Sequence, residues 1–362
     1  MKVLISGASV AGPALAWWLR RHGATPTVVE RAPAIRPGGQ AIDVRGAALT
    51  VVERMGLLEP VRAARTRMRG SSMVDSDGTE LWRSTEFAPS SGRFDSDDVE
   101  LLREDLTALL ASHTPDVDYR FGDSIASLHQ DAAGVDVRFA GGGKERFDLV
   151  VGADGLHSGV RRLAFGETPL LHLGSYVAVF TAGNVLGLDD WQVWVRSDTA
   201  GAGIYSARDN TELRVNVGFH SDALRYDHRD VAAQKHLVAA RCAGLGWEIP
   251  KLLEFMWDAP DFYFDAMAQV HLPTWSAGRV TLVGDAGYCA SPLSGQGTSL
   301  ALVGAYVLAD ELARAGDHVT ALTRYEERMR PFVTANQALA TENPGQPASD
   351  ESMAAAKDAI AL

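Results

Sequence analysis

The sequence contains few cysteines. Its 362 residues include only two, Cys242 and Cys289, and these lie far apart. Two isolated cysteines supply neither a disulfide scaffold nor the ligand pairs of a zinc site, and their scarcity is typical of the reducing cytosol. Cys289 is expected to be a small buried residue rather than a nucleophile. We therefore expect a cytoplasmic protein without a metal centre.

The sequence also lacks long apolar runs and an excess of positive charge. No apolar run approaches about 18 residues, the length that would predict a membrane span. Only Lys2 precedes the first apolar residues, so no signal peptide is expected. The formal net charge of −12 argues against nucleic-acid binding, which requires clustered cations. The arginines between 62 and 69 are interpreted as a solvated surface.

The first thirty residues follow a strand–turn–helix–strand pattern. A short apolar strand at 3–6 enters a glycine-containing turn, an apolar helix follows, and a second strand ends at Glu30. The turn, Gly7-x-Ser9-x-x-Gly12, has the first and third glycines of the dinucleotide-binding fingerprint but serine at the second. Glu30 stands near the position of the carboxylate that binds an adenosine ribose. The pattern indicates a dinucleotide site; the alternative is an ordinary strand–turn–helix.

Two further segments place polar groups near glycines or on a helix. Gly38 and Gly39 precede Asp43 in a loop that leads to an amphipathic helix at 47–55. They allow close approach of a ligand, or form a surface loop. Arg103 lies in a helical pattern over 97–111, for which Asp97 or Asp98 is the expected N-cap. Without further information, Arg103 can equally be a surface ion-pair residue.

The middle of the chain changes from an α/β pattern to alternating strands. An Asp-Gly turn predicts a hairpin over 70–84, and short segments from 117 to 151 predict an antiparallel meander. The meander returns to a buried strand that ends in Asp154-Gly155, which is by itself a common turn. From 171 to 220 the apolar residues alternate with period two, which predicts an inserted antiparallel sheet. Helices are expected at 231–241 and 249–256, and a further strand at 262–270.

The chain then returns to an α/β pattern. An apolar strand at 280–283 ends in Gly284-Asp285, a loop contains Pro292 and Gly295-Gln296-Gly297, and a long apolar helix begins near Thr298. A helix N-terminus offers unpaired N–H groups and a positive dipole end to an electron-rich ligand. A last helix is expected over 317–332, ending near Pro331, followed by a linker at 341–351 and a short helix.

Three motifs therefore occur in a definite order: Gly7-x-Ser9-x-x-Gly12 with Glu30, Asp154-Gly155, and Gly284-Asp285 with Gly295-x-Gly297. In this order they resemble the FAD-dependent aromatic hydroxylases, the group A flavoprotein monooxygenases of the p-hydroxybenzoate hydroxylase type. Within this family, the Gly38–Asp43 loop and the segment around Arg103 are most similar to the tetracycline-inactivating monooxygenases. The resemblance extends from residue 1 to about residue 315.

The resemblance implies an α/β fold with a Rossmann-type FAD-binding domain, an inserted antiparallel β-sheet substrate domain and C-terminal helices. The FAD-binding domain would comprise 1–70, 97–165 and 278–315, the substrate-binding domain 71–96 and 166–277, and the C-terminal helices 316–362. By the same resemblance, Glu30 would bind the ribose of FAD, and Arg103 and Asp43 would line the flavin. Asp285 would hold the ribityl or pyrophosphate region, and Asp154-Gly155 would contact FAD and a transient NAD(P)H. The expected cofactor-binding residues are Gly7, Ser9, Gly12, Glu30, Arg31, Asp43, Arg103, Asp154, Gly155, Asp285, Gly295, Gln296 and Gly297.

In this family NAD(P)H reduces the flavin, O2 adds at its C4a carbon, and the hydroperoxide passes oxygen to an electron-rich substrate. The resemblance therefore implies bound FAD, transient NAD(P)H, O2 and an aromatic or polyketide-like substrate for a monomer or homodimer. Pro292 and Gly295 are expected to position the flavin, with the N–H groups from 295 to 298 favouring its anionic reduced form; no general base is assigned. The substrate candidates, which can equally be core residues, are Tyr205, Asn216, Phe219, His220, Phe262 and Tyr263.

Two other functions remain open. Trp247-Glu248-Ile249-Pro250 resembles half of the signature of flavin-dependent halogenases, although it also reads as the start of a helix. No lysine between Lys2 and Lys144 is present to activate hypohalous acid. The second alternative is a protein that binds flavin or ligand without turnover.

Overall fold

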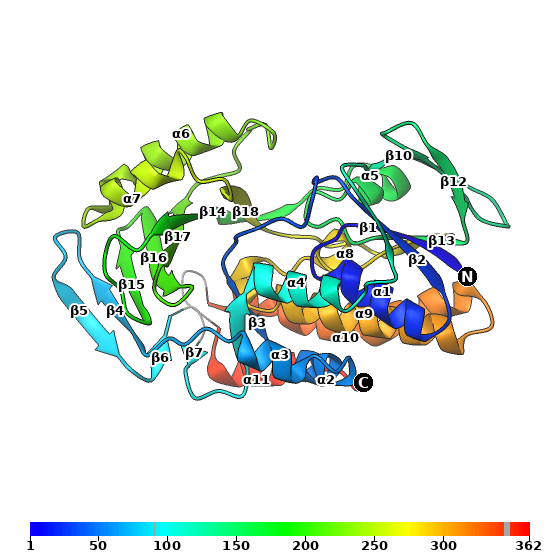
Figure 1. Cartoon of the computed structure of the whole chain (residues 1–362), viewed down its shortest axis with the longest axis horizontal. Helices are drawn as coiled ribbons and strands as arrows, with labels where there is room; N and C mark the ends of the chain where they lie inside the picture. The colour runs from blue at the N-terminus through cyan, green and yellow to red at the C-terminus, as the bar shows by residue number, and fades with distance from the viewer. Residues whose placement is uncertain (90–91, 344–347) are drawn as a thin grey trace.

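The computed structural model describes residues 1–89, 92–343 and 348–362, and two large sheets lie side by side in it (Figure 1). The first sheet has the strand order β19-β20-β13-β1-β2-β9. Its neighbouring strands are parallel except at β19, which pairs antiparallel with β20. The bounds are β1 Lys2–Ser6, β2 Thr25–Glu30, β9 Asp118–Phe121, β13 Leu149–Gly152, β19 Ser276–Ala277 and β20 Val280–Leu282.

Helices pack around this parallel sheet because its strands are almost continuously apolar. Residues 3–5 of β1 and 149–151 of β13 have no exposed surface, as expected for a sheet covered on both faces. The helices of this part are α1 Ala11–Arg21, α2 Ala47–Arg54, α3 Leu58–Ala63, α4 Arg103–Ser112, α5 Gly159–Phe165, α8 Asp285–Tyr288, α9 Gly297–Arg314 and α10 His318–Glu342. α9 is buried along most of its length and contacts α1, α2 and α10.

The second sheet has the strand order β18-β14-β17-β16-β15-β4-β5 and is antiparallel except for the parallel pair β15–β4. Its strands are β4 Gly70–Val74, β5 Glu80–Ser84, β14 Leu171–Gly183, β15 Trp191–Arg196, β16 Ala200–Ala207, β17 Glu212–His220 and β18 Tyr263–Gln269. α6 Val231–Cys242 and α7 Ile249–Met256 cover one face of it (Figure 1). The apolar residues on alternate strand positions pack against these helices in a second core.

Smaller elements connect the two sheets and flank them. β3 Ala41–Val44 pairs with β8 Val99–Leu102, and β6 Phe87–Ala88 pairs with β7 Gly92–Arg93. β10 Ile125–Gln130, β11 Val135–Phe139 and β12 Lys144–Phe147 form an antiparallel sheet beside the first one. Two 3-10 turns, η1 Ala243–Leu245 and η2 Pro292–Ser294, and the helix α11 Asp350–Lys357 complete the fold. Figure 1 shows α11 beside α2 and α3, near the end of the chain.

The structure corrects three expectations from the sequence. Residues 99–102 form a strand, not the first turn of a helix, because Val99 and Leu101 are buried at alternate positions and the backbone pairs with β3. Asp98 is therefore no cap; its carboxylate binds Lys357 instead. Residues 118–121 join the parallel sheet beside β2 rather than an antiparallel meander.

The last helix also continues past the expected end. α10 contains Pro331 in its interior and ends at Glu342. An internal proline costs about 3 kcal/mol, and the buried side chains that follow it, including Phe332 and Val333, offset this cost. Residues 344–347 of the expected linker lie outside the described residues. Among the described residues, no helix is both long enough and apolar enough to cross a membrane.

Candidate cofactor site

Four parallel strands deliver the three sequence motifs to one edge of the first sheet. β1 leads into Gly7, β2 ends at Glu30, β13 leads into Asp154, and β20 leads into Asp285. The strands are in register, with Ser6 opposite Gly152 and Gly152 opposite Leu282. Because the carboxyl ends of parallel strands meet at the same edge, segments far apart in sequence become neighbours there.

The turn after β1 depends on the absence of side chains at its two glycines. Gly7 has φ 111°, and a Cβ atom there would lie 2.4 Å from the carbonyl oxygen of Ala153. A Cβ atom at Gly12 would lie 1.9 Å from the carbonyl oxygen of Gly7. α1 then begins without a side-chain cap or an acidic residue in its first turn. Its first N–H groups and the exposed Ser9 are therefore available to an anion such as a diphosphate.

Glu30 is fixed beside this turn. Its two carboxylate oxygens accept hydrogen bonds from the backbone N–H groups of Ala8 and Ala32, at 2.9 Å each. An ionised carboxylate can accept about four hydrogen bonds, so two remain for ligand hydroxyls. The adjacent Arg31 is exposed. The structure thus brings Glu30 to the Gly7 turn.

The opposite wall is the start of α9. Its N-terminus has no side-chain cap and no acidic residue in the first turn. One carboxylate oxygen of Asp285 lies 3.9 Å from the position that a Cβ atom would take at Gly297. Burial, with a contribution from the charge of Asp265, raises the pKa of Asp285. The Asp285 carboxylate therefore lies where a bound hydroxyl would stabilise its charge.

The loop from Ser291 to Gly297 is held in a strained conformation. Ser291 is buried and has φ 72°, which costs a residue other than glycine about 1–3 kcal/mol. Pro292 is exposed, whereas Gln296 is fully buried. The side-chain amide of Gln296 donates to the sulfur of Met353 on α11, and its Oε1 has no hydrogen-bond partner among the described residues. This buried acceptor fits a ligand that brings its own donor.

Arg103 and Asp43 both lie in this region. Nη2 of Arg103 donates to the carbonyl oxygens of residues 36, 37 and 38, and so fixes the glycine loop. Burial, and then the charge of Arg36, lowers the pKa of Arg103 to about 10. A Cβ atom at Gly39 would lie 2.5 Å from Nε of Arg103, so there is no room for a side chain at residue 39.

Asp43 forms an ion pair of 2.9 Å with Arg45. Burial raises the pKa of Asp43 to about 7, although the charge of Arg45 lowers it. The backbone N–H of Arg45 donates to Ser299 on α9, and its guanidinium lies 3.5 Å from the position of a Cβ atom at Gly295. In the sequence Arg45 is a polar group near the glycine loop, as Asp43 is, but it was assigned no role there.

Asp154 has a structural task that the sequence did not reveal. Its carboxylate accepts hydrogen bonds from the hydroxyl of Ser158 and from the N–H groups of Gly159 and Val160, and so caps α5. Burial raises the pKa of Asp154. Its side chain is therefore engaged by α5, and a ligand at this edge would meet the backbone around Gly155, which has φ 80°.

The second sheet presents two different faces, and they divide the substrate candidates. Tyr205 and Asn216 lie on the face away from α6 and α7, and the Tyr205 hydroxyl accepts a hydrogen bond from the N–H of Ala41 on β3. Arg214 shares this face and binds Glu104 on α4 at 2.7 Å. This face therefore contacts the part that carries the cofactor motifs. The buried Gln192 lies on the paired strand, opposite Tyr205, and was missed by the sequence.

Of the other substrate candidates, two pack in the opposite core and one is exposed, whereas Tyr263 shares the face of Asn216 because both pair with Val179 of β14. Phe219 packs in the core under α6 and α7, with its ring stacked 5.5 Å from that of Tyr176. Phe262 packs against the same core. His220 is exposed at the end of β17. Tyr263 lies on β18, where its hydroxyl donates to Asp265 and Arg36 lies 5.1 Å from its ring.

The segment that resembles a halogenase motif forms the start of a helix. Trp247 and Glu248 precede α7, Glu248 is the N-cap residue, and Pro250 occupies the first turn. Proline is favoured there because the first N–H groups of a helix have no intrahelical partner. The structure therefore accounts for the Ile249-Pro250 pair by local conformation.

Comparisons with known proteins show what this chain is similar to. The family described as FAD binding domain matches residues 1–340. An uncharacterized protein of Mycobacterium tuberculosis (strain ATCC 25618 / H37Rv) is 54% identical over 345 residues, covering 94% of this chain and 93% of the relative. A flavin-dependent monooxygenase of Legionella longbeachae serogroup 1 (strain NSW150) is 43% identical over 340 residues, covering 93% and 87%. The crystal structure of tetracycline destructase Tet(55) aligns with a TM-score of 0.90 at 41% identity, covering 100% of this chain and 98% of that one.

Proposed function

Because this chain belongs to the FAD binding domain family and is a flavin-dependent monooxygenase, we propose that it inserts oxygen from O2 into an aromatic or polyketide-like small molecule. Bound FAD supplies the electron transfer from NAD(P)H and the activation of O2. One observation carries the proposal: Gly7, Glu30 and Asp285 meet at one sheet edge, beside two helix N-termini without side-chain caps.

Different residues at this sheet edge would bind different parts of FAD. The turn from Gly7 to Gly12, with the Ser9 hydroxyl, would hold the diphosphate at the start of α1. Glu30 and Arg31 would bind the adenosine, and Asp285 the ribityl hydroxyls. Residues 1–70, 97–165 and 278–315 would form this FAD-binding unit.

The N–H groups from Gly295 to Gly297 would stabilise negative charge on the flavin edge, because the dipole of α9 points its positive end there. Asp43 and Arg103 would line the flavin ring, together with the glycine loop that they flank. Gly155 would contribute its backbone, both to FAD and to a transient NAD(P)H. No side chain is assigned as a general base.

The substrate would lie against the face of the second sheet that carries Tyr205 and Asn216, within the unit of 71–96 and 166–277. The pattern of aromatic and amide groups there, with Gln192 and Tyr263, suits a ring system that has phenol or carbonyl oxygens. Pro292, exposed at the tip of its loop, would border the substrate side of the flavin. The likeness to tetracycline destructase Tet(55) supports fused-ring phenols as the class to test first.

The test begins with the purified protein. It should carry a flavin spectrum or gain one on titration with FAD, and its NADPH consumption should rise with an accepted substrate. The substrate panel comprises simple phenols, anthracyclines and tetracyclines, and the product is measured by mass for addition of one oxygen atom. Asp285→Asn should lose FAD, whereas Asp198→Asn, which removes a carboxylate from an exposed loop, should retain it.

The outcomes separate the three functions. Oxygen in the product supports the proposal. A halogenated product in the presence of chloride or bromide would identify a halogenase instead. Flavin binding without substrate-stimulated NADPH oxidation across the panel would leave a binding protein.

A further inference from the structure

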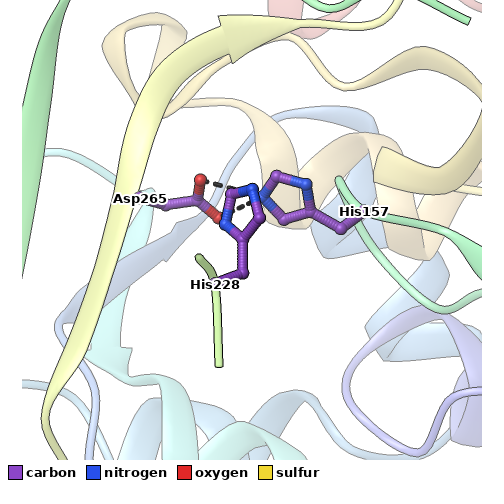
Figure 2. A group of neighbouring side chains, drawn as sticks. All are labelled: His157, His228 and Asp265. Carbon is purple, nitrogen blue, oxygen red and sulfur yellow. Dashed lines mark hydrogen bonds and ion pairs between the residues drawn. The ribbon is translucent and has the colours of Figure 1, made fainter. Parts of the chain in front are cut away.

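Three side chains from separate parts of the chain converge between the two sheets (Figure 2). His157 lies in the loop between β13 and α5, His228 precedes α6, and Asp265 lies on β18. One potential ligand atom from each residue lies within 4.8 Å of the other two. Figure 2 shows both imidazole rings turned toward the carboxylate.

Asp265 is the buried member of this cluster, with 6% of its surface exposed. Its carboxylate is held by the N–H of Ala266 at 2.8 Å and by the hydroxyl of Tyr263 at 3.1 Å. Among the described residues, the ion pairs found for Asp265 involve His157 and no lysine or arginine. The hydroxyl of Tyr226 lies 3.5 Å from the same carboxylate. A cation beside this buried group would further stabilise its negative charge.

The two histidines lie beside this carboxylate. Nε2 of His157 lies 2.9 Å and 3.0 Å from the two carboxylate oxygens of Asp265. The ring of His228 lies 4.0 Å from the ring of His157, centroid to centroid. Two imidazolium rings at this distance would repel each other, whereas two neutral rings can direct their lone pairs at one cation.

We propose that His157, His228 and Asp265 bind a divalent transition-metal ion of the zinc class, with a fourth coordination position open to water. Two imidazole nitrogens and one carboxylate oxygen are a donor set that such ions accept. Ligand atoms about 2.0–2.2 Å from a tetrahedral zinc lie about 3.3 Å apart. To reach this spacing, His157 and Asp265 must move slightly apart from 2.9 Å, and atoms as far apart as 4.8 Å must approach by up to about 1.5 Å. The histidine side chains are partly exposed, which leaves room for this shift.

The metal would replace the hydrogen bond between His157 and Asp265. A carboxylate oxygen only accepts, so Nε2 of His157 carries the proton in the metal-free protein. On binding, that proton leaves to solvent or moves to Nδ1, and the Nε2 lone pair coordinates the ion. The hydroxyl of Tyr263 and the N–H of Ala266 would remain on the carboxylate and orient it.

A metal at this position would join the two sheets. His157 belongs to the loop that follows the parallel sheet, whereas His228 and Asp265 belong to the antiparallel sheet and its connections. The ion would therefore cross-link parts of the chain that are separate in sequence and stabilise their arrangement. Zinc binding at this cluster can be measured without substrate and without turnover.

The test measures zinc binding by the FAD-loaded, tag-free protein in equilibrium dialysis, with magnesium as the hard-cation comparison. One equivalent of zinc should bind, magnesium should not compete, and zinc should raise the thermal unfolding midpoint. His157→Gln, His228→Gln and Asp265→Asn should each weaken zinc binding by at least about tenfold. His236→Gln, an exposed histidine on α6, is the matched control and should bind as the wild type does.

Flavin absorbance shows that each variant is folded, so loss of zinc is not confused with loss of structure. Absence of stoichiometric zinc binding by the wild type would overturn the proposal. Equal zinc affinity in His157→Gln and the control would overturn the assignment of these ligands. In either case the cluster would be a hydrogen-bonded His–Asp pair across the two sheets.

Discussion

Replacing Gly7 by alanine tests the placement of the diphosphate most directly. The change adds a Cβ atom 2.4 Å from the carbonyl oxygen of Ala153, at a residue with φ 111°. The positive φ costs about 1–2 kcal/mol. Relief of the contact costs about 1–3 kcal/mol more, because the neighbour is backbone rather than a flexible side chain. We therefore expect the free energy of unfolding of the apoprotein to fall by about 2–5 kcal/mol.

The same displacement would move the N–H groups at the start of α1. A hydrogen bond to a charged group is worth about 1.5–3 kcal/mol, so losing one would weaken FAD binding by roughly 10- to 100-fold. FAD affinity is measured by the quenching of flavin fluorescence on titration with apoprotein. Stability is measured in parallel by urea denaturation.

Gly23→Ala is the matched control. Gly23 also has a positive φ, 79°, but no atom lies within 4 Å of the added Cβ, and it follows the C-terminal end of α1. It should lose about 1–2 kcal/mol of stability and keep the wild-type affinity for FAD. If Gly7→Ala bound FAD as tightly as Gly23→Ala, the diphosphate would not lie at this turn, and the reasoning would be refuted.

Three further outcomes are expected. The folded-state pKa of Asp43 is raised to about 7, so the folded protein holds a proton that the unfolded chain releases near pH 4. The stability of the wild type should therefore fall as the pH rises from about 4 to 7. Urea titrations at several pH values should show a flatter profile for Asp43→Asn. Phe219→Ala should lose about 3–5 kcal/mol of stability with little change in the KM of the folded enzyme, whereas Asn216→Ala should mainly raise KM; the reverse would place Phe219 on the substrate. Pro292→Ala should retain FAD but alter the ratio of NADPH consumed to product formed, and simple loss of FAD would contradict its place beside the substrate.

Local chemistry explains why much of the fold could be predicted. Runs of apolar residues gave the buried strands β1 and β13, and period-two alternation gave the second sheet. The helix at 249–256 was predicted with the bounds that the structure shows. Gly7 was predicted in a turn and Gly284 at the end of a strand, and both have the positive φ that favours glycine.

Residues 99–102 show where local pattern was insufficient. Val99 and Leu102 are spaced by three and satisfy a helix, while Val99 and Leu101 are spaced by two and satisfy a strand. These residues form a strand because β3, more than fifty residues away in the sequence, supplies their backbone hydrogen-bond partners. Tertiary pairing therefore overrode the helical pattern.

The sequence by itself determined the order of the motifs and the alternation that separates the two faces of the second sheet. Only the tertiary structure decided which face meets the cofactor edge, and so separated Asn216 from Phe219. The tertiary structure also decided that the Asp154 carboxylate binds N–H groups at the start of α5, and that His157, His228 and Asp265 lie together. The physical reason is that backbone conformation follows neighbouring residues, whereas a site is made of side chains whose proximity depends on how distant strands and loops pack.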